Sequence, residues 1–170
     1  MKVLTPSKDR VEPKCPVARQ CGGCQIQEMR YEAQLAFKQK MVQNNLERIG
    51  GLSDFEMYPV IGMETPYAYR NKAQFPVGED KDGNIVIGFY AGRTHHIVEQ
   101  TDCCIGAPEN GEVLRKVKAY MQKNQIRPYN EEHHSGIVRH ILIRTGYHTK
   151  EIMVCLIVNA AKASCLKNAE

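Results

Sequence analysis

The sequence predicts an α+β fold in which a mostly antiparallel β-sheet is combined with two helices. Two segments carry apolar residues at helical spacing, and short segments rich in β-branched and aromatic residues lie between them and after them. Turn residues, glycine among them, separate several of these strand segments. Because helices and strands do not alternate regularly along the chain, we do not expect a parallel α/β fold.

The composition is that of a globular protein. The 170 residues are 42% hydrophobic and 25% charged, which excludes a mainly disordered chain. No apolar run approaches the roughly 18 residues of a membrane-spanning helix. The N-terminus also lacks the apolar segment of a secretion signal, so we expect a cytoplasmic protein without a membrane partner. A net charge of +4 is only a weak preference for acidic partners.

The first 24 residues are interrupted by proline, glycine and cysteine and therefore predict a loop. A helix is expected over residues 25–51. Its apolar side chains recur on one helical face, at Leu35, Val42, Leu46 and Ile49. The pair Gly50-Gly51 is a typical helix end.

Strand signals follow this helix. We expect strands at residues 58–62, 68–77, 85–90 and 94–98, with a turn at residues 80–84. A second helix is expected over residues 108–123, and then a hairpin of residues 137–145 and 151–158. The last strand is almost continuously apolar, so we expect both of its faces to be covered. A buried strand so close to the last residue suggests that the sequence belongs to a longer protein.

Three cysteines, Cys15, Cys21 and Cys24, lie within ten residues. A Cys-x-x-Cys pair lets two sulfurs reach one metal centre, and the glycines between them leave room for backbone amides beside the sulfurs. In a chain without a secretion signal, such a cluster indicates a metal rather than disulfides. Zinc and an iron–sulfur cubane both need a fourth ligand, for which Cys103 and Cys104 are the candidates.

The other cysteine of interest is Cys155. It lies inside an apolar strand, so we expect it to pack as a small hydrophobic residue. Spacing alone does not separate zinc from an iron–sulfur cluster at the remaining cysteines.

Several motifs along the chain resemble those of one known family. They are Cys15-Pro16, Cys21-Gly22-Gly23-Cys24, Tyr69-Arg70-Asn71-Lys72-Ala73-Gln74-Phe75, Gly88-Phe89-Tyr90 and Ile137-Val138-Arg139-His140. Together they resemble the bacterial 23S ribosomal RNA (uracil-5-)-methyltransferases, the iron–sulfur branch of the RNA 5-methyluridine methyltransferase family. The resemblance covers nearly all of residues 6–160.

The resemblance implies a 4Fe–4S cluster held by Cys15, Cys21, Cys24 and Cys103, since Cys103 lies 79 residues after Cys24 and the family places its fourth cysteine similarly. It divides the chain into the exit segment of a truncated RNA-binding TRAM barrel at 1–14, a cluster loop at 15–24, a helix at 25–51, a central α+β domain at 52–160 and a tail at 161–170. The family's Rossmann-like domain binds S-adenosylmethionine and supplies the catalytic groups. Nothing in this sequence resembles that domain.

Residues 69–74 combine a ring, two cations and two amides on one expected strand. Alternation predicts Tyr69, Asn71 and Ala73 on one face of the sheet and Arg70, Lys72 and Gln74 on the other. Arginine and amide side chains read base edges, and tyrosine stacks on unpaired bases. We therefore predict RNA contacts at Tyr69, Arg70, Lys72, Gln74 and Arg139.

Positive charge is concentrated in the second half of the chain. Residues 113–150 contain eight Lys or Arg against two Glu, a local charge of +6 that suits either phosphate contact or a solvated surface. Within this segment Arg139 and Arg144 are five residues apart on one strand, so we expect them on opposite faces.

The sequence thus predicts the cluster-bearing, RNA-binding central part of an S-adenosylmethionine-dependent methyltransferase. By the resemblance, the enzyme forms 5-methyluridine in 23S rRNA, and residues 1–170 alone are inactive. Two alternatives stay open. One is a zinc-holding RNA-binding module that uses the same cysteines, and the other is a small iron–sulfur electron carrier.

Overall fold

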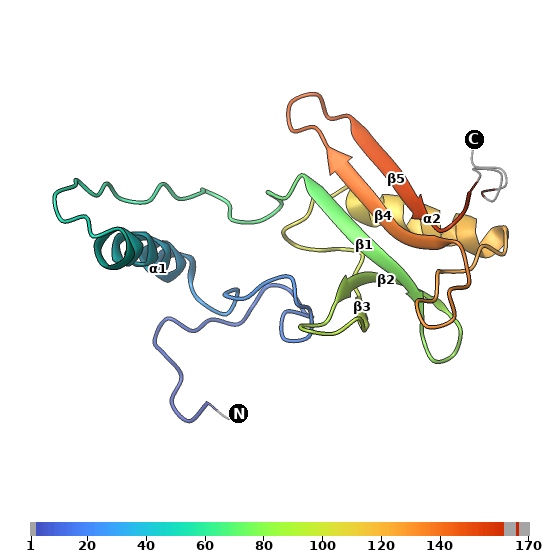
Figure 1. Ribbon diagram of the computed structural model, residues 1–170, viewed down its shortest axis with the longest axis horizontal. Coiled ribbons are helices and arrows are strands. Elements are labelled where there is room, and N and C mark those ends of the chain that lie inside the picture. The colour runs from blue at the N-terminus through green and yellow to red at the C-terminus, as the bar shows by residue number, and fades with distance from the viewer. Residues whose placement is uncertain (1–2, 162–165, 167–170) are drawn as a thin grey trace. The chain divides into compact units, whose positions relative to one another are not determined.

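The computed structural model describes residues 3–161 and residue 166, so the predicted tail lies almost entirely outside the described residues. The chain forms two compact units (Figure 1). The helical unit consists of Met1–Lys14 and Cys24–Pro66, and the sheet unit consists of Cys15–Gly23 and Tyr67–Glu170. No helix in the described part of the chain combines the length and the apolar character of a membrane span.

The helical unit is built around α1, Tyr31–Asn44, which continues into a π-helical turn at Asn45–Ile49. α1 begins six residues later than predicted, because the residues before it pair with the N-terminal segment. The Val11 amide donates to the Glu28 carbonyl (2.8 Å), and the Arg30 amide donates to the Asp9 carbonyl (2.9 Å). No residue of α1 is buried, so the apolar face predicted for this helix does not pack into a core.

Residues 58–62 do not form the predicted strand. Side chains of α1 instead accept hydrogen bonds from backbone amides within this stretch and directly after it. The Val60 amide donates to the Gln39 Oε1 atom (3.1 Å), and the Met63 amide donates to the Tyr31 hydroxyl oxygen (2.7 Å). Backbone donors that would otherwise need a neighbouring strand are thereby satisfied.

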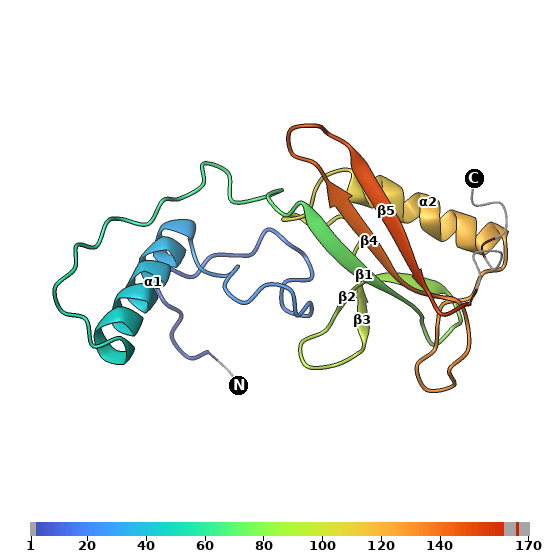
Figure 2. The same ribbon diagram turned by 45° about the horizontal axis from the view of Figure 1, so that its top comes forward.

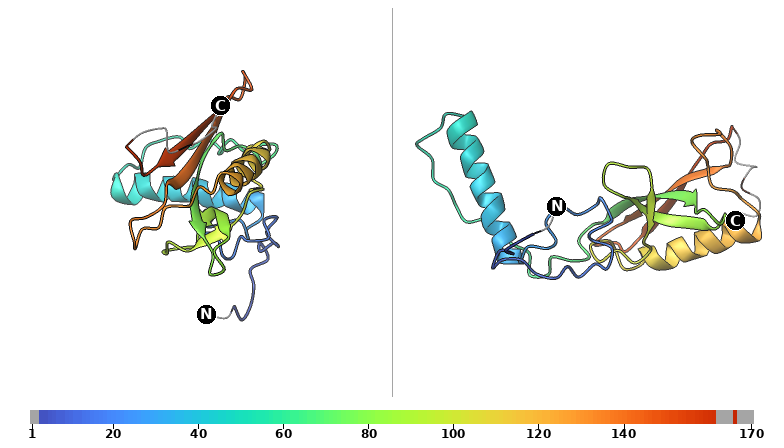
Figure 3. Two further views of the ribbon diagram at one scale, coloured as in Figure 1. Left: turned by 90° about the vertical axis from the view of Figure 1, so that its right-hand side faces the viewer. Right: turned by 90° about the horizontal axis from the view of Figure 1, so that it is seen from below.

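The sheet unit contains a five-stranded antiparallel sheet in the order β3-β2-β1-β4-β5 (Figure 2). Its strands are β1 (Lys72–Glu79), β2 (Ile85–Tyr90), β3 (Ile97–Glu99), β4 (Val138–Thr145) and β5 (Ile152–Val158). One helix, α2 (Asn110–Lys123), lies along one face of this sheet (Figure 3). This is the α+β architecture that the sequence predicted.

Local turn chemistry sets the β1–β2 connection, as the sequence predicted. The Asp80 carboxylate accepts hydrogen bonds from the Asp82 and Asn84 amides (2.9 and 2.8 Å). The hydrogen bond from the side-chain amide of Asn84, followed by these backbone bonds, holds the pKa of Asp80 below its usual range. Gly83 has φ +80°, a left-handed conformation that glycine adopts without steric cost.

The core lies between α2 and the sheet. Leu114 and Met121 of α2 are fully buried with Phe75, Ile87 and Ile141 of the strands. Full burial of a side chain of this kind stabilises the fold by about 1.5–3 kcal/mol. The core therefore fixes α2 to one face of the sheet and leaves the opposite face, here called the open face, for other contacts.

The last strand differs from the expectation that both of its faces are covered. β5 forms an edge of the sheet, and its residues Ile152–Cys155 are exposed. Cys155 is therefore not the buried small hydrophobe that we expected. An edge strand packs against a neighbour on one side only, so a continuously apolar sequence does not ensure burial.

Candidate nucleic-acid interface and thiol loop

Two of the residues predicted to contact RNA lie on the part of the open face that β1 forms. Lys72 and Gln74 are exposed, whereas Ala73 and Phe75, which alternate with them, are buried on the α2 side. Within β1 the structure thus confirms the predicted alternation. Whether these side chains bind RNA stays a prediction.

Two cations lie opposite each other on the open face. Lys72 of β1 pairs with Arg144 of β4, so both side chains project from the same face, and both residues are exposed. Like charges directly across two strands destabilise a sheet. An anion bound between them removes that repulsion, so this position suits a phosphate group.

Tyr69 and Arg70 precede β1 rather than belonging to it. The Ala68 amide donates to the Cys104 carbonyl (3.0 Å), and the Arg70 amide donates to the Ile105 carbonyl (2.9 Å). The Tyr69 residue is 51% exposed. The structure therefore places these two predicted RNA contacts beside the segment that contains the predicted fourth cysteine ligand.

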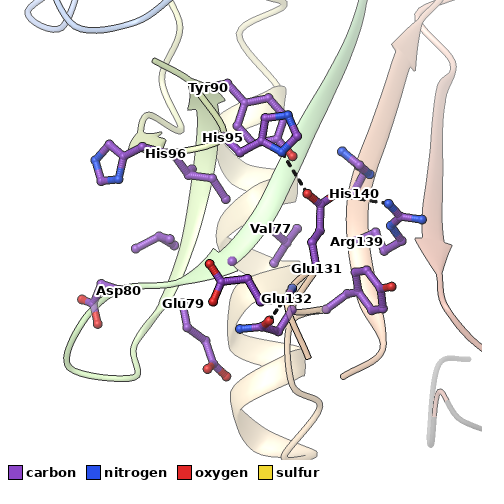
Figure 4. A pocket seen from close by; sticks show the side chains of 15 residues that line it. Val77, Glu79, Asp80, Tyr90, His95, His96, Glu131, Glu132, Arg139 and His140 are labelled. Atoms are coloured by element: carbon purple, nitrogen blue, oxygen red, sulfur yellow. Dashed lines mark hydrogen bonds and ion pairs between the residues drawn. The ribbon is translucent and has the colours of Figure 1, made fainter. Parts of the chain in front are cut away.

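A cavity of about 460 Å³ lies on the open face, near the turn that ends β1 (Figure 4). Its walls come from β1, β2, the segment between β2 and β3, the connection at residues 128–136 and the start of β4. The volume is within the roughly 300–1,000 Å³ range of small-molecule pockets. Sequence reasoning did not find this cavity.

Glu131 lies at the centre of the polar contacts in this cavity. Its Oε2 atom is 2.9 Å from His95 Nδ1, and its Oε1 atom is 3.3 Å from Arg139 Nη2. The hydrogen bond to His95, and then that to Arg139, lower the pKa of Glu131, so its carboxylate is ionised at neutral pH. The contacts of Glu131 with a histidine and an arginine thus connect three separate chain segments (Figure 4).

Aromatic rings line the same cavity. The Tyr90 and His95 rings are stacked with centroids 5.2 Å apart, and the Arg139 guanidinium lies 4.7 Å from the centre of the Tyr129 ring. Partial burial raises the pKa of Tyr90. Burial, together with the nearby Arg139, lowers the pKa of His140. Rings and a neutral imidazole suit an uncharged planar ligand better than a bare phosphate.

The structure corrects the prediction for Arg139 and Arg144. A β-bulge lies between Val138 and His140 of β4 and breaks the alternation on which that prediction depended. Arg139 and His140 both line the cavity on the open face. His140 and Arg144 are four residues apart on β4, beyond the bulge, so their side chains lie on the same face. Arg139 and Arg144 therefore do not belong to opposite faces.

Much of the positive charge of residues 113–150 is paired. Five of its eight cationic residues make ion pairs with carboxylates: Arg115, Lys116, Lys118, Arg127 and Arg139. Three of these five belong to α2, on the far side of the core from the open face. The charge of these three residues therefore belongs to a solvated, salt-bridged surface of α2.

The predicted cluster cysteines are divided between the two units. Cys15, Cys21 and Cys103 belong to the sheet unit, and Cys24 begins the second segment of the helical unit, three residues after Cys21. All six cysteines that the structure describes are thiols. In the described part of the chain, no three Cys, His, Asp or Glu side chains are gathered as a metal site.

Hydrogen-bond donors lie beside these sulfurs. The Gln100 side-chain amide lies 3.9 Å from the Cys15 sulfur and also donates to the Asp102 carbonyl (3.0 Å). The Gly23 amide lies 3.4 Å from the Cys21 sulfur. Donors of this kind stabilise metal-bound thiolates, so the chemistry of the donor set fits a thiolate-ligated metal or cluster.

A second contact fixes the cysteine loop to the sheet. The Gly22 amide donates to the Tyr90 carbonyl at the end of β2 (2.9 Å), and Cys21 forms an isolated bridge with Ala91. A Cβ atom on residue 22 would lie 3.0 Å from that carbonyl oxygen, so glycine allows the close approach.

Sequence reasoning missed Gln100 and the residues of the cavity. Gln100 lies three positions before Cys103, and an amide so close to a predicted ligand was a usable signal. No sequence signal pointed to Glu131 and His95, because they are 36 residues apart and are brought together only by the fold.

Comparisons with known proteins find related sequences. The chain is 50% identical to a Halalkalibacterium halodurans protein named as an uncharacterized RNA methyltransferase, over 92% of this chain and 34% of that protein. It is 46% identical to a Bacillus cereus protein with the same designation, over 95% of this chain and 35% of that protein. Homologues of this chain are thus named RNA methyltransferases, and the chain spans about a third of their length.

Part of one solved structure has the same fold as this chain. The chain superimposes with a TM-score of 0.72 on the Pyrococcus abyssi tRNA (uracil-54, C5)-methyltransferase, whose crystal structure contains S-adenosyl-L-homocysteine. The sequences are 26% identical, over 98% of this chain and 36% of that chain. No family model matches the sequence.

Proposed function

We propose that this chain is the RNA-binding part of an S-adenosylmethionine-dependent methyltransferase that forms 5-methyluridine in RNA. The observation that carries the proposal is the similarity of almost the whole chain to proteins named RNA methyltransferases. The structural neighbour, a uracil C5-methyltransferase crystallised with the demethylated cofactor product, supports the choice of reaction.

Methyl transfer to uracil C5 requires a nucleophile that adds to C6 and a base that removes the C5 proton. The resemblance assigns both groups, and the cofactor site, to a domain outside residues 1–170. We therefore expect the isolated chain to bind RNA without methylating it. Transfer of labelled methyl groups to RNA by the chain alone would contradict the assignment of the catalytic groups to another domain.

In this proposal the open face binds the RNA backbone through Lys72 and Arg144. Gln74 lies two residues along β1 from Lys72, on the same face, and offers an amide to a base edge. Tyr69, Arg70 and Arg139 extend this surface as the further contacts predicted from the sequence. An exposed tyrosine stacks on unpaired bases irrespective of sequence.

The experiment is a salt titration of RNA binding with two charge-matched double variants. K72A/R144A removes the two cations of the open face, and K116A/K123A removes two cations of α2. For single-stranded RNA, each phosphate contact adds about 0.7 to the slope of log affinity against log salt. We expect the slope to fall by about 1.4 in K72A/R144A. Equal slopes for the two variants would contradict the placement of RNA on the open face.

We further propose that Cys15, Cys21, Cys24 and Cys103 hold a 4Fe–4S cluster. The donors beside the Cys15 and Cys21 sulfurs support a thiolate site. Methyl transfer consumes no electrons, so the proposed role is structural.

Metal analysis after anaerobic purification tests the cluster. About four irons and four sulfides per chain are expected for a cubane. About one zinc per chain would instead favour the zinc-holding RNA-binding module with the same cysteines. Iron and sulfide without any RNA binding would favour the electron carrier.

For the RNA target we propose 23S rRNA, on the strength of the cysteine motif. The structural neighbour is named for tRNA, so tRNA is the competing substrate class. Competition between 23S rRNA fragments and tRNA transcripts for the chain decides between them. Preferential displacement by tRNA would overturn the ribosomal assignment.

A further inference from the structure

The cavity around Glu131 has a chemistry different from that of the Lys72–Arg144 position. Four carboxylate side chains line it, those of Glu79, Asp80, Glu131 and Glu132, together with the single guanidinium of Arg139. Such a lining repels phosphate, so the ligand of this cavity is not the RNA backbone. The ring faces of Tyr90, His95 and Tyr129 suit a planar ligand that stacks.

Glu131 keeps hydrogen-bonding capacity in this arrangement. An ionised carboxylate has about four lone-pair sites, of which the contacts with His95 and Arg139 use one on each oxygen. The Glu131 side chain is 47% exposed. One acceptor site on each oxygen is therefore open to a ligand that approaches from the cavity.

Arg139 extends this acceptor pair with a donor. Its guanidinium carries five N–H groups, and the contact with Glu131 uses only part of them. The edge formed by Arg139 and Glu131 thus presents one donor followed by two acceptors. Guanine presents the complementary order on its Watson–Crick edge, with O6 as acceptor and N1–H and the N2 amino group as donors.

The other bases match this edge less well. Uracil presents an acceptor on each side of one donor, so one of its acceptors would meet a carboxylate oxygen. Cytosine offers one donor and then two acceptors, and adenine offers one donor beside one acceptor. Only guanine places two donors against the carboxylate.

We propose that the cavity binds one unpaired guanine base of the RNA, with Glu131 and Arg139 on its Watson–Crick edge. The proposal rests on the proposed function, because it requires that the open face binds RNA. It adds base selection at a position away from the phosphate contacts at Lys72 and Arg144. Sequence-specific recognition of RNA usually targets such unpaired bases.

The test measures binding of short fluorescent oligouridines with one central variable base. Fluorescence anisotropy gives the affinity for guanine, adenine, cytosine, uracil and hypoxanthine at that position. We expect guanine to bind about tenfold more tightly than the other standard bases, because each of them loses at least one of the two charged hydrogen bonds to Glu131. Hypoxanthine lacks only the N2 amino group and should fall between guanine and adenine.

Two charge-matched variants localise the effect. E131Q and E132Q each remove one negative charge from the same cavity, so any general gain in RNA affinity is shared. We expect E131Q to abolish the preference for guanine and E132Q to keep it. Equal loss of the guanine preference in both variants would overturn the guanine site. Equal affinity of the wild-type protein for all five bases would also overturn it.

The outcomes separate the two proposals. RNA binding without base preference leaves the proposed function standing and removes the guanine site. The absence of binding to any oligonucleotide or to 23S rRNA fragments removes both. The comparison of guanine with hypoxanthine needs no variant, so it is valid even where a substitution disturbs folding.

Discussion

Gly136 controls the position of the connection at residues 128–136, which carries Glu131. It has φ +87°, and a Cβ atom there would lie 1.8 Å from the Pro128 carbonyl oxygen. Gly83, in the β1–β2 turn, is the matched control, because it has φ +80° and a Cβ atom added there would meet no atom within 4 Å. Replacement of each glycine by alanine therefore separates backbone strain from steric overlap.

The expected magnitudes follow from this difference. G83A introduces only the strain of a left-handed alanine, about 1–2 kcal/mol. G136A introduces the same strain and also has to move the Pro128 carbonyl away. That movement breaks bonds such as the one from the Tyr129 amide to the Val138 carbonyl (2.9 Å). With about 1 kcal/mol for each of one or two lost bonds, G136A should cost about 2–4 kcal/mol in total.

Urea denaturation followed by circular dichroism measures both variants. We expect a larger loss of unfolding free energy in G136A than in G83A. The RNA assay should show loss of the guanine preference in G136A alone. Equal destabilisation of the two variants would refute the reasoning, since it would mean that residues 128–136 adapt to a side chain without cost.

Three further predictions concern the core, the pH dependence and the thiols. L114A should lower the unfolding free energy by about 3–5 kcal/mol in urea denaturation, because the Leu114 side chain is fully buried; a loss below about 1 kcal/mol would contradict the core described above. The pKa of His140 is lowered from 6.5 in the folded protein, chiefly by burial, so the unfolded chain binds the proton more readily. The contribution of His140 to the unfolding free energy should therefore be constant above about pH 7.5 and fall as the pH drops through 6.5 towards the folded pKa. H140Q should reduce that fall. If H140Q leaves the pH profile of the thermal midpoint unchanged, His140 does not have this role. C21S should lower the bound iron whereas C155S should not, and colorimetric iron analysis that shows equal loss would argue against a site at Cys21.

Local signals predicted the elements that depend on them. Residues 85–90 form β2 as predicted, because a run of apolar and aromatic residues follows an Asp-Gly turn that Asp80 stabilises through its own carboxylate. The hairpin of β4 and β5 also matches the prediction closely. Its turn and its apolar strands lie within a single short segment, so no distant partner was needed to recognise it.

Elements that depend on distant partners were predicted less well. Helical periodicity could not show that residues 25–30 pair with the N-terminal segment, and α1 therefore starts later than expected. The bulge beside Arg139 has no sequence signal in this chain, yet it decides the face on which that side chain lies. Exposure of β5 depends on its place at the sheet edge, which is a property of the topology.

The candidate site shows the same limit. The cysteines stand out because they are close in sequence, whereas the cavity combines residues from separate parts of the sheet unit. Lys72 and Gln74 were recognised because strand alternation is a local rule. Their neighbour Arg144 follows only from the β1–β4 register.

The position of β1 in the sheet has a consequence for the order of events during synthesis. β1 pairs with β2 after a short turn, but its other edge pairs with β4, Val138–Thr145, which the ribosome makes about sixty residues later. Until α2 and β4 have emerged, the nascent chain presents an unpaired edge and an uncovered Phe75. The unpaired edge of such an intermediate attracts strands of other chains, and simultaneous translation of many copies raises the risk of aggregation. Slow translation between β2 and β4 would therefore lengthen the period in which chaperones are needed, although the folded protein itself would be unchanged.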